Sequence, residues 1–148
     1  MNLAFLIDTN VLSELMRAQP DLQVMKRFDQ QVDDECYTSS ITKSEIFLGI
    51  SLLHEGARRT RLADAAEKIF SEDFYDRCLP FDHQSAIMYA ELVSNRIRKG
   101  KPVSTEDALI AAIALRENLT LVTRNTKDFT EIEGLVLVNP WDDTRSGE

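Results

Sequence analysis

Three carboxylates in this chain stand where an apolar run ends or a helical pattern begins. Asp8 follows the apolar run 3–7, while Glu45 and Asp107 each come in the first turn of a predicted helix. Carboxylates that converge repel one another, and a divalent cation with hard oxygen ligands relieves that repulsion. Such an arrangement would support hydrolysis of a phosphodiester by metal-activated water, a reaction that requires no histidine.

A fourth polar group extends this acidic set. Asn125 comes just after the apolar run 119–123, and Asp128 follows three residues later. Both are therefore candidate members of the same site.

Each carboxylate also has a structural alternative. Thr42 and Glu45 fit a capping box, in which Thr42 is the N-cap and Glu45 reaches back to it. Ser104 and Asp107 have the same spacing, and Asp8 fits the N-cap of the helix that follows it. Taken singly, each residue favours helix capping, whereas acids gathered at one edge of a sheet favour a metal site.

The elements that must position these residues follow from the apolar pattern. We expect strands at 3–7, 36–41, 78–81, 119–123 and 135–138, and helices from 9 to before Pro20, at 21–32, from 42 onward, at 83–99 and at 104–115. Short strands that alternate with helices predict an α/β domain with a mainly parallel central sheet and helices on both faces. Ligands bind such sheets beyond the carboxyl ends of the strands, where the acids would meet.

The length of 148 residues fits one domain. No linker or repeat interrupts the chain, so we expect a single domain over residues 1–141 and a polar tail over residues 142–148. No run approaches the ~20 apolar residues of a membrane span, and the N-terminus lacks the basic segment of a signal peptide. We therefore expect no membrane partner.

Charge and reactive residues argue against several classes of protein. The 17 Lys and Arg against 25 Asp and Glu give a net charge of −8, which is unfavourable for nucleic-acid binding by a basic face alone. A nucleic-acid enzyme whose acids are neutralised by metal stays compatible with this charge. Cys36 and Cys78 have no metal-ligand spacing and fit a reducing cytoplasm. His54 and His83 stand near no nucleophile motif, which argues against a Ser-His-Asp enzyme.

Five segments together resemble the PIN-domain family. They are LIDTNVLSEL from Leu6, SSITKSEIFLGI from Ser39, STEDALIAAIAL from Ser104, LVTRNTKDF from Leu121 and VNPW from Val138. Within that family the chain is most similar to the VapC/FitB-type ribonuclease toxins of type II toxin–antitoxin pairs. The likeness covers nearly the whole chain, in the expected order and spacing.

This resemblance implies a three-layer α/β/α PIN-like domain that acts on RNA as a Mg²⁺-dependent endoribonuclease, with Mn²⁺ as an alternative metal. It also implies a cytoplasmic homodimer, or a larger toxin–antitoxin assembly. A cognate antitoxin would inhibit the enzyme by inserting a segment, often with a basic side chain, into the acidic groove. Operator DNA would be bound only through the antitoxin.

Residue by residue, the resemblance assigns roles to the acidic set. Asp8 and Asp107 match the principal metal-binding aspartates. Glu45 matches the acid between them, which binds the metal or orients and deprotonates the attacking water. Asn125 matches the last position of the threonine-arginine-acid motif, which is usually Asp. Its amide brings no charge, so the site has three strong anions, and Asp128 is an alternative acid that fits a turn equally well.

Two further sets of residues have open roles. Thr9, Asn10 and Thr123 are placed to orient the carboxylates, but we expect them mainly to cap backbone groups. Basic residues cluster at Arg58, Arg59 and Arg61 and again within 96–101. These clusters fit contacts to an RNA backbone or solvated helix faces, and we favour solvated faces.

Two other functions stay open at this point. A PIN-type nuclease that processes ribosomal or messenger RNA would need no antitoxin. A phosphoacceptor regulatory module, or a phosphatase with an aspartyl nucleophile, would need a second acid beside Asp8, where Thr9 and Asn10 stand instead.

Overall fold

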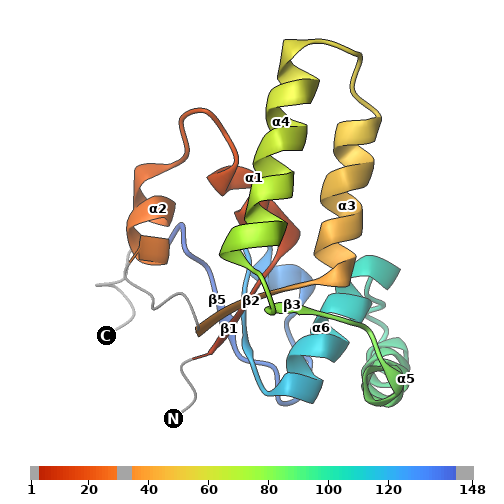
Figure 1. The fold of residues 1–148 in the computed structure, drawn as a ribbon. Helices are drawn as coiled ribbons and strands as arrows, with labels where there is room; N and C mark the ends of the chain where they lie inside the picture. Colours follow the sequence, from red (N-terminus) through yellow and green to blue (C-terminus); the bar gives the residue numbers. More distant parts are fainter. Residues whose placement is uncertain (1–3, 30–34, 143–148) are drawn as a thin grey trace.

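The computed structural model describes residues 4–29 and 35–142. Short strands and helices alternate along them (Figure 1). The strands are β1 (Phe5–Ile7), β2 (Cys36–Ser39), β3 (Cys78–Leu79), β4 (Thr120–Val122) and β5 (Leu137–Val138). The α-helices are α1 (Thr9–Leu15), α2 (Leu22–Asp29), α3 (Ser40–Ser51), α4 (Ala57–Lys68), α5 (His83–Arg98) and α6 (Thr105–Glu117). A π-helical turn, η2 (Ile69–Asp73), extends α4, and a 3-10 turn, η3 (Thr126–Asp128), follows β4.

These strands form an all-parallel sheet in the order β3-β2-β1-β4-β5, which confirms the predicted parallel sheet. The central strand β1 pairs with β2 on one side and with β4 on the other, so that Leu6 lies opposite both Tyr37 and Leu121. The chain builds outward from β1 to β3 and then crosses back to place β4 beside β1. The strand order therefore reverses between β1 and β4, which is where open α/β sheets bind their ligands.

Helices cover both faces of the sheet, as predicted. Leu6 and Leu121 belong to a core cluster with α5 and α6, whereas Ile7 and Val122 belong to a second cluster with α1, α2, α3 and α4. Successive strand residues point to opposite faces, so one short strand contributes to both clusters. Figure 1 shows α3 and α4 side by side above the sheet and α5 with α6 at its other side. The result is the expected three-layer α/β/α arrangement.

Helix α6 is buried on most faces because its sequence is apolar nearly all round. The residues of α6 that expose at most 1% of their surface are Ala108, Ile110, Ala111, Ala112, Ile113 and Ala114. Small alanine side chains let the helix lie close to its neighbours. This burial fixes the start of α6, where Asp107 stands.

The start of α3 differs from the prediction. β2 ends at Ser39, and Ser39 rather than Thr42 is the N-cap, because its hydroxyl accepts the backbone N–H of Thr42 at 3.1 Å. Serine and threonine both meet the chemical requirement for an N-cap, so the sequence did not distinguish them. The earlier start buries Thr42 completely. The capping box assigned to Glu45 is therefore wrong, and Glu45 lies in the second turn of α3.

Other boundaries are shorter than predicted. β5 spans Leu137–Val138 rather than 135–138. Asp21 precedes α2 and caps it by accepting the backbone N–H groups of Gln23 at 2.9 Å and Val24 at 3.1 Å. The predicted helix residues 30–32 and the tail residues 143–148 lie outside the described residues. In the described parts of the chain, no helix is long and apolar enough to cross a membrane.

The burial of α6 gives a stability prediction. We expect Ile110→Ala to lower the free energy of unfolding by about 2–5 kcal/mol, because it leaves a cavity in the core. Ile97→Ala on α5 is the matched control, since Ile97 is 61% exposed. We expect that variant to change stability by about 0.5 kcal/mol or less, measured by urea unfolding. Equal losses for the two variants would contradict the burial of α6.

Candidate active site

Asp8 follows the central strand and is almost completely buried, with 4% of its surface exposed. As the N-cap of α1, it accepts the backbone N–H of Thr9 on Oδ1 at 2.8 Å. Its Oδ2 accepts the side-chain amide of Asn10 at 3.1 Å and the hydroxyl of Thr123 at 2.8 Å. The predicted capping role is confirmed, but it uses only one of the two carboxylate oxygens.

The hydroxyl of Thr123 closes this network from the neighbouring strand. Thr123 follows β4, donates to Asp8, and accepts the Asn10 amide at 3.3 Å and the backbone N–H of Asn125 at 3.2 Å. Asn10 Oδ1 accepts the backbone N–H of Arg124 at 3.1 Å, which turns the amide nitrogen toward Asp8. Asn10 and Thr123 therefore orient the carboxylate in addition to the backbone capping that we expected.

Glu45 approaches the same place from α3. Its Oε1 accepts the hydroxyl of Thr9 at 2.7 Å, and the hydroxyl oxygens of Thr9 and Thr42 are 3.0 Å apart. An ionised carboxylate only accepts, and Thr9 has a single hydroxyl proton, so Thr42 supplies the proton of the second contact. The buried Thr42 thus fixes Thr9, and Thr9 fixes Glu45 beside the start of α1.

Asp107 comes from the first turn of α6. Ser104 is the N-cap of that helix, and its hydroxyl accepts the backbone N–H of Asp107 at 3.2 Å, as predicted. The Asp107 side chain is half-buried. Burial raises the pKa of Asp107, the hydrogen bond with Ser104 lowers it, and the charges of Asp128 and Glu106 raise it.

The negative charges of the other two acids act on Asp8. Burial raises the pKa of Asp8 most, hydrogen bonds from Thr123 and Thr9 lower it, and the charges of Asp107 and Glu45 raise it further. Over residues 4–29 and 35–142, no lysine or arginine forms an ion pair with any of these acids. The site is a concentration of negative charge that the protein itself does not neutralise.

This donor set fits a hydrated divalent cation. A carboxylate has about four lone-pair positions. Donors from the described part of the chain occupy three of these positions on Asp8 and leave one on Oδ1. Among the described residues, no group of three or more Asp, Glu, His or Cys side chains is arranged to hold a metal ion by itself. Mg²⁺ keeps several waters and needs only one or two protein carboxylates. The acids therefore suit an open site that water and substrate oxygens complete.

The remaining predicted residues lie at the surface beside this network. Asn125 is exposed before η3 and joins the network through its backbone N–H, which donates to Thr123. Asp128 is also exposed and acts on Asp107 through its charge. The structure thus brings Asp8, Glu45 and Asp107 together, and it leaves the amide of Asn125 at the rim.

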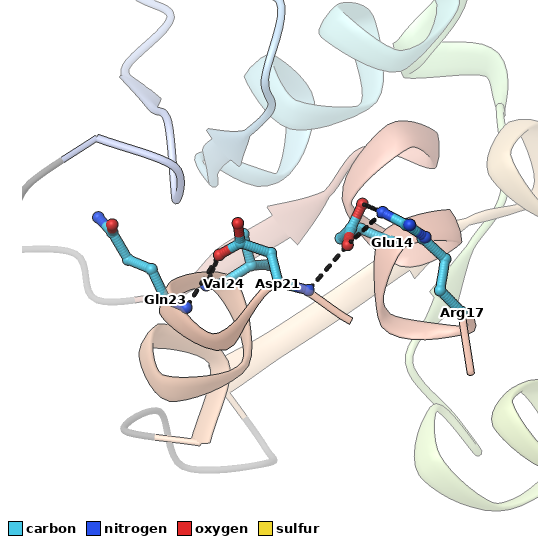
Figure 2. Close-up of polar contacts among 5 residues, drawn as sticks. All are labelled: Glu14, Arg17, Asp21, Gln23 and Val24. Atoms are coloured by element: carbon cyan, nitrogen blue, oxygen red, sulfur yellow. Dashed lines mark hydrogen bonds and ion pairs between the residues drawn. The ribbon is translucent and has the colours of Figure 1, made fainter. Parts of the chain in front are cut away.

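Sequence reasoning missed Glu14, which is 7% exposed on α1. Figure 2 shows its carboxylate between α1 and the start of α2, where it accepts the backbone N–H of Asp21 at 2.8 Å and pairs with Arg17 at 3.1 Å. The sequence did contain a signal for Glu14, because an acid there interrupts an apolar helical pattern. Glu14 also stands four residues after Asn10 and therefore on the same face of the helix.

A groove of about 820 Å³ opens beside the acidic site, between α1, α3 and α4. Thr9, Asn10 and Glu45, which belong to the hydrogen-bond network, line part of it. Its remaining lining includes apolar residues of α3 and arginines of α4. The acids therefore stand next to a space large enough for part of a polymer.

Comparisons with known proteins identify the family of this chain. Residues 5–135 match the family described as PIN domain. Plasmid stability protein StbB of Pseudomonas syringae pv. tomato is 41% identical over 93% of this chain and 98% of its own length. Toxin FitB of Neisseria gonorrhoeae is 37% identical over 93% of this chain and 99% of its own. VapC ribonuclease Y4jK of Sinorhizobium fredii is 36% identical over 92% of this chain and 96% of its own length.

Two solved toxin–antitoxin complexes contain chains of the same fold. A chain of FitAB bound to an IR36 DNA fragment superposes with a TM-score of 0.87 and 35% identity over 94% of this chain and 96% of that one. The second complex is VapBC2 from Rickettsia felis bound to a DNA fragment from its promoter. One of its chains gives a TM-score of 0.78 and 28% identity over 94% of this chain and 99% of that one.

The raised pKa of Asp8 predicts a pH-dependent stability. The folded state holds this proton more tightly than the unfolded state. The stability that Asp8 contributes is therefore full below its ordinary pKa and is lost as the pH rises through its raised folded-state pKa. Without divalent cations, we expect the wild type to lose stability over this range relative to Asp8→Asn, measured by urea unfolding from acidic to neutral pH. Asp64→Asn on the exposed side of α4 is the control, and an equal effect of both variants would contradict the assignment to Asp8.

Proposed function

Because the chain belongs to the PIN-domain family, we propose that it is a Mg²⁺-dependent endoribonuclease and the toxin of a type II toxin–antitoxin pair. The relatives named VapC ribonuclease and toxin FitB support a nuclease toxin. One observation carries the proposal: the buried Asp8 carboxylate is fixed by three donors beside two further acids.

In the proposed enzyme, Asp8 and Asp107 hold the metal, and Glu45 contacts it directly or through water. Bound Mg²⁺ would supply Lewis acidity, which acidifies water and offsets the charge that develops on phosphate. The free acceptor position on Asp8 Oδ1 and the half-buried Asp107 suit this role. The neutral amide of Asn125 leaves three anions, which favours one metal over two.

Glu45 is the group proposed to orient and deprotonate the attacking water. The hydroxyl of Thr9 fixes Oε1, and Thr42 fixes Thr9, so Oε2 is directed to accept the water proton. In-line attack forms the new bond to phosphorus and breaks the bond to the 3′ oxygen, which takes up a proton. The products then carry a 5′-phosphate and a 3′-hydroxyl.

The proposed partner is a cognate antitoxin that inhibits the enzyme. Relatives solved as toxin–antitoxin complexes with DNA support this partner. A basic side chain of the antitoxin would neutralise the acids around Asp8. Operator DNA would be contacted through the antitoxin, because this chain has a net charge of −8. An RNA substrate implies action in the cytoplasm.

Other functions receive less support. An RNA-processing nuclease without an antitoxin would use the same acids, but the toxin named among the relatives favours the toxin. A phosphoacceptor module would need a second acid beside Asp8. Thr9 and Asn10 occupy that place, and their side chains bind Glu45 and Asp8.

A homodimer is a further part of the proposal. Leu48 on α3 and Leu52, the C-cap residue one turn later, expose 60% and 76% of their surface, and such an apolar pair suits contact with a second copy. We expect Leu48→Glu combined with Leu52→Glu to give a monomer in sedimentation velocity at concentrations where the wild type is dimeric. A double variant that stays dimeric would contradict contact through this face.

RNA cleavage tests the proposed activity. We expect the wild type to cleave RNA in the presence of Mg²⁺, and we expect cleavage to stop when the metal is chelated. Asp8→Asn and Asp107→Asn should each reduce the rate on the order of 10²-fold or more, because each removes a charged group that the reaction needs. End-group analysis of the fragments should find 5′-phosphates, whereas a 2′,3′-cyclic phosphate would contradict water as the attacking group.

Metal binding has a readout apart from cleavage. Mg²⁺ at about 100 times its dissociation constant should stabilise the wild type by about 2.7 kcal/mol, and Asp8→Asn should lose this stabilisation. Asp64→Asn, exposed on α4, should keep both the stabilisation and the activity. Wild-type rates in both Asp8→Asn and Asp107→Asn would overturn the mechanism.

A further inference from the structure

The charges of the groove beside the acidic site favour an anionic occupant. Its charged lining residues are Glu14, Arg17, Glu45, Arg58 and Arg61. Glu14 is already compensated, because it pairs with Arg17 at 3.1 Å (Figure 2). Glu45 belongs to the catalytic acids. The charges that stay uncompensated away from the acids are therefore the two guanidinium groups of α4.

Arg58 and Arg61 have no acceptor among the residues that the structure describes. They stand three residues apart on α4, so they share one face of the helix, and both are exposed. Arg59, which the sequence grouped with them, does not line the groove. The basic cluster is therefore divided, with Arg58 and Arg61 on the groove and Arg59 outside it.

The groove also contains a glycine that no internal contact explains. Gly49 lies in the interior of α3, where glycine is less favourable than alanine. A Cβ atom at Gly49 would meet no atom of the described residues within 4 Å, so close packing among them does not require glycine there. The open space over the helix backbone leaves room for a group from outside the chain. Ile50 and Leu53 give the surface beside it an apolar character.

We propose that this groove holds the RNA strand on one side of the scissile phosphate, with Arg58 and Arg61 as phosphate-binding residues. The inference rests on the proposed ribonuclease activity and adds a substrate subsite to it. Guanidinium groups bind phosphate oxygens through paired hydrogen bonds, and the apolar surface beside Gly49 accepts the faces of bases. A protein segment would fill the apolar part, but it would need acids of its own to match the two arginines.

The salt dependence of RNA binding tests this subsite. The probe is a short, end-labelled, unstructured single-stranded RNA, and every protein carries Asp107→Asn so that the RNA is not consumed. The slope of log affinity against log salt changes by about 0.7 for each phosphate neutralised on a single strand. We expect Arg58→Ala combined with Arg61→Ala to flatten the slope by about 1.4 and to weaken binding about tenfold.

Two further variants separate a charge effect from a loss of folding. Lys68→Ala removes an exposed cation of α4 that lies outside the groove, and it should change neither slope nor affinity. Gly49→Met adds a helix-favouring side chain into open space, so its Tm should equal or exceed that of the parent. Its RNA affinity should fall with the salt slope unchanged, because the obstruction is steric.

The outcomes distinguish this subsite from the proposed activity. An unchanged slope and affinity in the double arginine variant would overturn the subsite, as would a parent protein that binds no RNA. Loss of binding to a co-expressed antitoxin alone, with RNA binding intact, would assign the groove to that protein. If the wild type cleaves no RNA but RNA binding depends on Arg58 and Arg61, the proposed nuclease activity is contradicted and the proposed RNA subsite is supported.

Discussion

Burial of the Asp8 carboxylate is the constraint on which the rest of the site depends. A carboxylate removed from water is strongly unfavourable unless fixed donors replace the water. The donors here come from the start of α1 and from Thr123 at the end of β4, so the bonds that satisfy the charge also join these two elements. Thr123 can reach Asp8 only because the strand order reverses at β1 and places β4 beside it. The sheet topology and the shape of the site are thus determined together.

These hydrogen bonds compensate Asp8 only in part. Burial outweighs them, and the charges of Asp107 and Glu45 add to it, so the pKa of Asp8 stays raised. A lysine or arginine placed among these acids would remove the repulsion, but it would also occupy the oxygens that a cation needs. Leaving the acids unpaired weakens the folded protein locally and leaves carboxylate oxygens available to the proposed cation. Function and stability therefore have opposite requirements at this point.

Local patterns predicted the parts of the structure that depend on local chemistry. The buried helix α6 and its Ser104 cap follow from a run of apolar residues and a hydroxyl at the correct spacing. The cap of α3 was misplaced because Ser39 and Thr42 are chemically equivalent as caps. The contact between Thr123 and Asp8 joins residues 115 positions apart, and no local pattern reports such a pairing. The division of the arginine cluster likewise depends on where α4 lies against α3.

The distribution of charge makes the proposed action on a polyanion compatible with a net charge of −8. The proposed catalytic acids come from residues 1–50, with 4 basic and 8 acidic groups, and from residues 101–148, with 5 basic and 9 acidic groups. The arginines of the groove come from residues 51–100, which have 8 of each. RNA would therefore be attracted by guanidinium groups on the groove and repelled at the acids until a cation covers them. In this proposal, metal binding and RNA binding would be coupled, because each would favour the other at the same end of the groove. An antitoxin with a basic side chain among these acids would break that coupling by replacing the metal.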